Sequence, residues 1–311
     1  MSSDYFIRWI FLGIIAVIAA TWLCALHVTI EFGAVAPKLQ FASVLLLFST
    51  VYVGLGNRLL VIRRPVAVVS DLCLSILQVM VATTVLLPLT YLAATTRFPL
   101  LDDHLAQLDA LIGFHWDAVA QWVRQRPMID WVLQCAYASC PVQASALLLI
   151  GSIKRPDDRN SEAIWLLIVS LLITTAIFAF TPALGKIGHV GTAYLNVLEQ
   201  IRGGNWSVLS FDRAEGIVTF PSFHTTLAIL FTYLVRHDRW ALAIFGPTNV
   251  LMILSTPTVG GHYLVDLFGG ASVAIVSVVV VRALRARIAG PRAGGMADAS
   301  LKVGDLHLVL K

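Results

Sequence analysis

The stretch that decides the fold class is residues 261–283, GHYLVDLFGGASVAIVSVVVVRA. It begins with two ionisable residues, His262 and Asp266, and then continues without a charge as far as Arg282. An apolar run of about 20 residues crosses the ~30 Å hydrocarbon core of a bilayer as a helix. The stretch therefore predicts a transmembrane helix that carries two ionisable residues close to one of its ends.

The composition of the whole chain agrees with this interpretation. Hydrophobic residues make up 58% of the 311 residues, charged residues make up 13%, and the mean hydropathy is +0.82. A soluble domain carries about 25% charged residues, so the composition argues against a cytosolic enzyme, a disordered chain and a nucleic-acid binder. The net charge of +4 requires no polyanionic partner, because membrane proteins collect Lys and Arg in their cytoplasmic loops.

Apolar segments recur along the whole chain. Eight of them resemble membrane spans, at roughly 8–31, 39–56, 66–96, 133–152, 163–183, 222–236, 240–256 and 261–283. We therefore expect an all-α, polytopic bundle of about eight transmembrane helices, of which the last six form the core. The four cysteines lie in apolar stretches and form no metal-type cluster, so we predict neither a metal site nor a cofactor.

The distribution of basic residues predicts the orientation in the membrane. With eight spans, 15 of the 22 Lys and Arg residues fall on the side that also carries both termini. The positive-inside rule makes this side cytoplasmic. We expect an integral protein of a bacterial inner membrane, with the long segments 97–132 and 184–221 on the periplasmic side. The first apolar segment has no clear cleavage site, which favours a first span over a signal peptide.

The outer segment 97–132 has two possible interpretations. Apolar residues recur every three or four positions between 101 and 112, as in an amphipathic helix. An interfacial helix with Phe114, Trp116 and Trp122 as anchors at headgroup depth is favoured. A lid or substrate entrance is the alternative.

Three ionisable residues gather at the predicted outer ends of two spans. His224 opens the sixth span, and His262 and Asp266 open the eighth. At a spacing of four residues on a helix, a carboxylate shares a face with an imidazole and fixes its tautomer. The second ring nitrogen is then a candidate nucleophile, and His224 is a candidate general acid. Pro221 suits the first turn of a helix, whose free N–H groups favour an anion.

Simpler explanations exist for each of these residues alone. A histidine in a membrane is often a hydrogen-bonded packing residue, and the pair of His262 and Asp266 also suits a structural contact or part of a metal site. A proton or ion path through the same residues would make the protein a transporter. Asp71, inside the third span, is interpreted as a paired structural carboxylate in preference to a proton relay. The enzyme is favoured because the polar residues gather at one face rather than along a path.

These residues resemble the motifs of a known family. Phe220-Pro-Ser-Phe-His224 is similar to the Pro-Ser-x-His motif of the type 2 phosphatidic acid phosphatase superfamily, and His262-x-x-x-Asp266 is similar to the end of its Ser-Arg-x5-His-x3-Asp motif. Asp109 and the aromatic residues that follow it resemble the subgroup that includes fungal inositol phosphorylceramide synthase.

The resemblance implies an enzyme that transfers a phosphoryl group without a metal, from a lipid phosphate or phospholipid to water or to a lipid alcohol. His262 would form a phosphohistidine, Asp266 would orient it, and His224 would act as the general acid and base. The resemblance divides the chain into N-terminal transmembrane helices over 1–96, a catalytic membrane domain over 97–289 and a cytoplasmic tail over 290–311. A lipid-phosphate phosphatase and a head-group transferase are both compatible with it.

The chain departs from the family pattern at the residues that hold the phosphate. The Lys-x6-Arg-Pro motif is absent, and Thr256 occupies the position of the arginine in the third motif. Another cation must then compensate the charge of the phosphoryl group. Arg202, which precedes two glycines, is the first candidate and Lys186 is the second. The full set of predicted substrate-binding residues is Arg202, Lys186, Ser222 and Arg213, the last of which has Asp212 and Glu215 as alternative partners.

Overall fold

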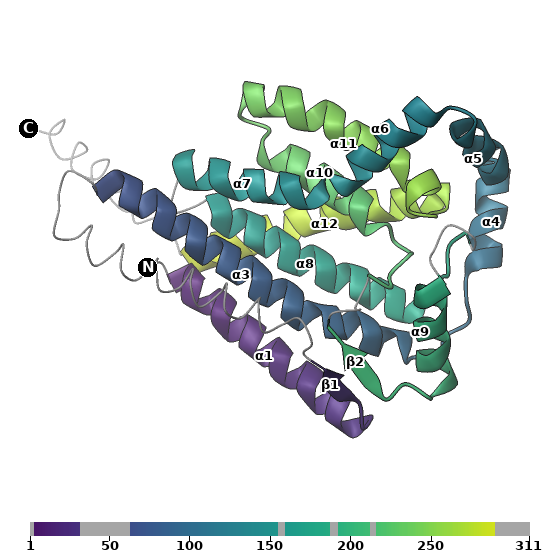
Figure 1. Ribbon diagram of the computed structural model, residues 1–311. Helices are drawn as coiled ribbons and strands as arrows, with labels where there is room; N and C mark the ends of the chain where they lie inside the picture. Colours follow the sequence, from purple (N-terminus) through teal and green to yellow (C-terminus); the bar gives the residue numbers. More distant parts are fainter. Residues whose placement is uncertain (1–2, 32–62, 155–158, 187–191, 212–215, 290–311) are drawn as a thin grey trace, which may run out of the picture.

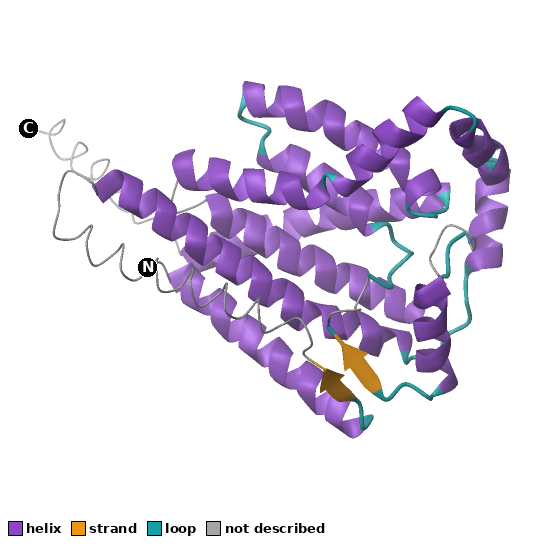
Figure 2. Ribbon diagram, viewed as in Figure 1, coloured by secondary structure: helices purple, strands orange, loops and turns teal. Residues whose placement is uncertain are grey.

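The computed structural model describes five stretches of the chain, residues 3–31, 63–154, 159–186, 192–211 and 216–289. These stretches are almost entirely helical, as Figures 1 and 2 show. The predicted second span at 39–56, the predicted phosphate ligand Arg213 and the predicted tail at 290–311 lie outside the described residues.

Eleven helices lie within the described residues. They are α1 (Ser3–Ala25), α3 (Arg63–Ala94), α4 (Asp102–Leu111), α5 (Trp116–Arg124), α6 (Pro127–Ala138), α7 (Cys140–Lys154), α8 (Arg159–Phe180), α9 (Thr192–Gly203), α10 (Phe223–Leu234), α11 (Arg239–Val259) and α12 (Leu264–Ala289). Two short strands, β1 (Thr29–Glu31) and β2 (Val208–Ser210), pair in parallel and join the end of α1 to the segment after α9.

Five of the described helices are long and apolar enough to cross a membrane, namely α1, α3, α8, α11 and α12. The expected all-α membrane bundle is therefore confirmed, but the expected count of eight spans is not. The predicted span 133–152 is divided between α6 and α7, which meet at an angle of 46°. Pro141 explains this break, because it has no N–H to donate to the preceding turn. Helix α10 has 12 residues, so it is only about 18 Å long.

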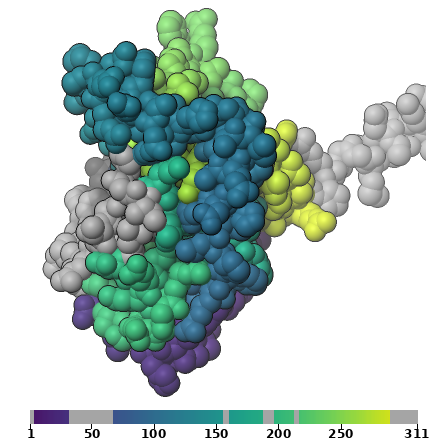
Figure 3. All heavy atoms as spheres, turned by 90° about the vertical axis from the view of Figure 1, so that its right-hand side faces the viewer, coloured from purple at the N-terminus to yellow at the C-terminus, as the bar shows by residue number. Residues whose placement is uncertain are grey.

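The segments that connect the helices separate into two ends of the bundle. Helices α4, α5 and α9 and both strands lie at one end, which is on the right in Figure 1. The space-filling view onto this end shows α4 to α6 and α9 covering it (Figure 3). The first residues of α1 and the last residues of α12 lie at the opposite end. The two segments expected on the outer side are therefore at the same end of the molecule.

The opposite end of the bundle is held by polar contacts. The Oδ2 atom of Asp71 accepts hydrogen bonds from Ser152 Oγ at 2.8 Å and from Asn160 Nδ2 at 2.9 Å, which joins α3, α7 and α8. These contacts agree with the interpretation of Asp71 as a paired structural carboxylate.

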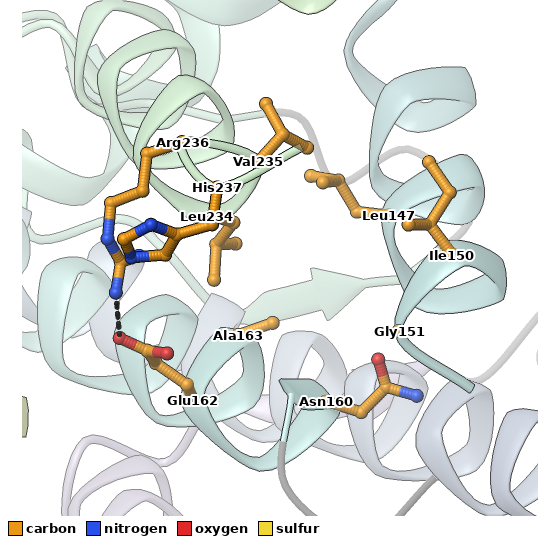
Figure 4. Close-up of a pocket in the computed structure, with 10 residues that line it drawn as sticks. All are labelled: Leu147, Ile150, Gly151, Asn160, Glu162, Ala163, Leu234, Val235, Arg236 and His237. Atoms are coloured by element: carbon orange, nitrogen blue, oxygen red, sulfur yellow. Dashed lines mark ion pairs between the residues drawn. The ribbon is translucent and has the colours of Figure 1, made fainter. Parts of the chain in front are cut away.

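A cavity of about 70 Å³ lies nearby, where Glu162 and Arg236 form an ion pair at 3.8 Å (Figure 4). It contains none of the predicted site residues.

Candidate active site

The two histidine segments meet because α10 begins directly against α12. The main-chain N–H of Ser222 donates to the carbonyl of Asp266 at 3.1 Å, and Thr226 Oγ1 donates to the carbonyl of Gly270 at 2.9 Å. A Cβ atom on Gly270 would lie only 2.3 Å from the carbonyl oxygen of Ser222. Glycine at this position is thus required for the approach that brings His224 to the start of α12.

Ser222 is the N-cap of α10. Its Oγ accepts a hydrogen bond from the main-chain N–H of Thr225, and its side chain is completely buried. The expectation that Pro221 lies in the first turn of the helix was wrong, because α10 starts at Phe223, after the cap. The first-turn N–H groups of Phe223 and His224 still lack acceptors within the helix, and both residues line a cavity.

His262 and Asp266 are in contact, but they do not share a helical face. Helix α12 begins at Leu264, so His262 belongs to the loop before it, which corrects the prediction. Asp266, in the first turn, reaches back and places its Oδ2 atom 3.2 Å from His262 Nδ1. The same oxygen accepts the main-chain N–H of Tyr263 at 2.9 Å. This contact engages Nδ1 and leaves Nε2 available for chemistry.

His224 and His262 line the same cavity, which has a volume of about 280 Å³. The His224 ring stacks on the ring of Tyr137 from α6, with 3.9 Å between centroids and 22° between planes. This stacking limits rotation of the imidazole. The wall also contains Thr174 of α8, whose Oγ1 atom is buried without a hydrogen-bond partner among the described residues. The cavity thus presents two imidazoles and a free hydroxyl within a largely apolar lining.

The sequence analysis missed Tyr137 and Thr174. An aromatic residue or a threonine within an apolar span is usually a packing residue, and nothing near either position in the sequence distinguishes it. The only signal for Thr174 was a polar residue in the middle of the span expected at 163–183. Their proximity to the histidines depends on how α6 and α8 pack around α10.

Lys186 lies beside the His262 loop. Its main-chain N–H donates to the carbonyl of Gly261 at 2.8 Å. Its ammonium lies 5.3 Å from the centroid of the Tyr263 ring and 5.9 Å from that of Trp116. The side chain of Lys186 thus lies close to two aromatic rings, and one of them, Tyr263, directly follows His262.

Arg202 occupies a different place from the histidines. Its Nη2 atom donates to the carbonyl of Phe98 at 2.8 Å, and its Nη1 atom is buried without a partner among the described residues. The residue is not part of the cavity wall. The structure therefore gathers His224, His262, Asp266 and Ser222, together with the main chain of Lys186. The side chains of Lys186 and Arg202 both lie outside the wall of this cavity.

The outer segment 97–132 packs tightly over this site. The Trp116 side chain is 7% exposed and donates from Nε1 to the carbonyl of Pro257 at 2.9 Å, so it is not the headgroup anchor that was expected. Trp122, in contrast, is 48% exposed and remains a candidate anchor. One side of the segment thus contacts the loop before α12.

These features define an integral membrane protein in which a carboxylate-bound histidine and a second histidine face one cavity. The family profile of the PAP2 superfamily, the type 2 phosphatidic acid phosphatases, matches residues 103–280. The match covers more than half of the chain and both histidine segments, so the chain belongs to the PAP2 superfamily. Members of this superfamily are generally phosphatases or phosphotransferases. No curated protein and no solved structure matches the chain. The resemblance to the inositol phosphorylceramide synthase subgroup stays a prediction.

Proposed function

We propose that the protein transfers phosphoryl groups from a lipid phosphate or phospholipid through a phosphohistidine on His262. The observation that carries this proposal is the contact between His262 Nδ1 and Asp266, with His224 on the wall of the same cavity. A carboxylate bound to Nδ1 fixes the tautomer and stabilises the imidazolium that forms during attack. This arrangement suits a nucleophile with its orienting group.

The reaction has two steps. In the first, the Nε2 lone pair of His262 attacks phosphorus, the bond to the leaving oxygen breaks, and that oxygen takes a proton from His224. In the second, His224 removes a proton from the acceptor, whose oxygen attacks phosphorus and releases His262. Water as acceptor gives a phosphatase, and a lipid alcohol gives a head-group transferase such as an inositol phosphorylceramide synthase. Both activities use the same residues.

The phosphoryl oxygens need donors within this apolar cavity. The first-turn N–H groups of α10 are suitable because a helix N-terminus attracts anions, and Ser222 holds that turn in place. We propose Lys186 as the cation, because its main chain is bonded to Gly261, the residue before His262. Its ammonium lies beside Tyr263 and Trp116, outside the histidine cavity, so this role requires its flexible stem to turn toward the substrate. Arg202, bound to Phe98, becomes the second candidate. Arg213 keeps its predicted role as a substrate-binding residue.

We propose that the site faces the periplasm. The excess of basic residues that the sequence assigns to the end where α1 begins and α12 ends supports a cytoplasmic position for that end. The histidine cavity is formed by the start of α10 and α12, toward the end that carries α4 and α9.

One experiment tests both the activity and the side of the membrane. Right-side-out and inverted vesicles that contain the protein are incubated with EDTA and a panel of lipid phosphates and phospholipids, with and without lipid alcohols. Mass spectrometry should detect inorganic phosphate or a transferred head group from right-side-out vesicles, but not from vesicles with His262→Ala. Turnover only in inverted vesicles would place the site in the cytoplasm, and no turnover in either would contradict the function.

The assignment of the phosphate cation gives a second prediction. Lys186→Ala should lower kcat/KM by about 10²-fold, the scale of losing one strong electrostatic donor. Arg202→Ala, at a residue bound to Phe98, should stay within a few-fold of the parent per folded molecule. Steady-state kinetics on both variants, normalised to the folded fraction, provides the comparison. The opposite ranking would return the assignment to Arg202.

A further inference from the structure

The residue before helix α12 offers no side-chain acceptor to the N–H groups of its first turn. Tyr263 precedes the helix, and a tyrosine side chain is not among the residues that cap a helix N-terminus. Asp109 of α4 supplies the missing acceptors from more than 150 positions away in the sequence. Its Oδ2 atom accepts the N–H of Leu264 at 2.9 Å, and its Oδ1 atom accepts the N–H of Val265 at 3.0 Å.

The burial of Asp109 explains why both of its carboxylate oxygens are hydrogen-bonded. The residue is only 3% exposed, and a buried carboxylate is costly unless its oxygens are hydrogen-bonded. Both oxygens bind N–H groups at the positive end of a helix, where a negative charge is favoured. Asp109 therefore fixes the first turn of α12, which contains Asp266 and directly follows the His262 loop.

A second carboxylate of α4 supports the same loop. Asp102 accepts hydrogen bonds from the main-chain N–H groups of Leu184 and Gly185, both at 2.9 Å, and from the hydroxyl of Tyr263 at 3.2 Å. Burial, together with the adjacent Asp102 carboxylate, raises the pKa of Tyr263, so its hydroxyl keeps the proton that it donates. Asp102 thereby ties both Tyr263 and the neighbouring segment 184–185 to α4.

We infer that Asp109 is a positioning residue for the nucleophile His262, a role that rests on the proposed function. Asp266 fixes the imidazole directly, whereas Asp109 fixes the main chain from which Asp266 projects. A displacement of about 1 Å in a reacting group can cost 10²-fold in rate. Loss of Asp109 should accordingly slow the attack of His262 on phosphorus without weakening the binding of the lipid.

The test compares Asp109→Asn and Asp109→Ala with Asp103→Asn, which removes the same charge from an exposed residue of α4 that makes no hydrogen bond in the described structure. Asp109→Asn keeps one acceptor oxygen but turns an NH₂ group toward the other N–H. It should lower kcat and the rate of phosphoenzyme formation about 10-fold, and Asp109→Ala should lower both about 10²-fold, with KM within a factor of two or three. Asp103→Asn should match the parent.

Hydrogen exchange of the peptide 260–270, followed by mass spectrometry, reports the contact without using activity. Both Asp109 variants should exchange this peptide at least 10-fold faster than the parent. Unchanged exchange would overturn the contact. Faster exchange with kcat unchanged, when kcat is normalised to the amount of protein that can form the phosphoenzyme, would show that Asp109 only stabilises the fold. That result would overturn the positioning role. A parent protein that forms no phosphoenzyme and turns over no lipid would overturn the proposed function, and the positioning role with it, while exchange still reports the cap.

Discussion

His262→Ala is expected to abolish lipid turnover and phosphoenzyme formation together. In the proposed reaction the Nε2 atom of His262 makes the new bond to phosphorus, and among the described residues of the cavity wall only His262 has its imidazole oriented by a buried carboxylate. Rapid quenching in alkaline detergent after mixing with a radiolabelled lipid phosphate, followed by analysis for acid-labile, base-stable label on the protein, measures the intermediate directly.

The control for this variant is His237→Ala. His237 is exposed and belongs to the small cavity at the opposite end of the bundle (Figure 4), so its loss should leave both turnover and labelling unchanged. Full turnover in His262→Ala would exclude a phosphohistidine at this position. If His262→Ala lost turnover but the protein still became labelled, the phosphorylated group would belong to another residue.

His224→Ala should show a loss that depends on the leaving group. With an ordinary lipid phosphate the alkoxide requires a proton as it departs, so removal of the general acid should lower kcat by about 10²–10⁴-fold. With a nitrophenyl phosphate ester the leaving oxygen is stable without a proton, and the first step should recover most of the parent rate. The burst of nitrophenol at pH 7, measured by stopped-flow absorbance, isolates this step from the second one.

A His224→Ala variant equally slow with both leaving groups would contradict the role of general acid. Such a result would indicate that His224 mainly shapes the cavity. Tyr137→Phe serves as the reference, because it keeps the ring that stacks on His224 at 3.9 Å and removes only the hydroxyl. It should retain the leaving-group dependence of the parent.

Much of the site could be predicted from the sequence because its chemistry is carried by short-range patterns. The apolar runs fixed the membrane class, since the thickness of the bilayer dictates the length of a span. The spacing of His262 and Asp266 predicted their contact, even though the helix starts only at Leu264 and the carboxylate reaches back to the loop. The Pro-Ser-x-His pattern predicted the position of His224, and the PAP2 superfamily match covers both segments.

The tertiary structure alone decided which distant residues support these histidines. Asp109 and Trp116 belonged to a segment whose periodicity indicated an interfacial helix, because periodicity shows which face is apolar but not what that face covers. No local pattern marks Gly270, yet a Cβ atom at this position would lie 2.3 Å from the carbonyl oxygen of Ser222. Arg202 was favoured for its charge and side of the membrane, yet its guanidinium binds the carbonyl of Phe98.

The sequence by itself thus determined the membrane bundle and the superfamily, and it predicted the candidate histidines and carboxylate, because each of these depends on residue type and local spacing. Only the tertiary structure decided how α10 and α12 approach, which ring stacks on His224 and which carboxylate caps the helix behind His262. Those contacts join residues that are 40 to more than 150 positions apart. Their geometry follows from the packing of whole helices, which no local pattern encodes.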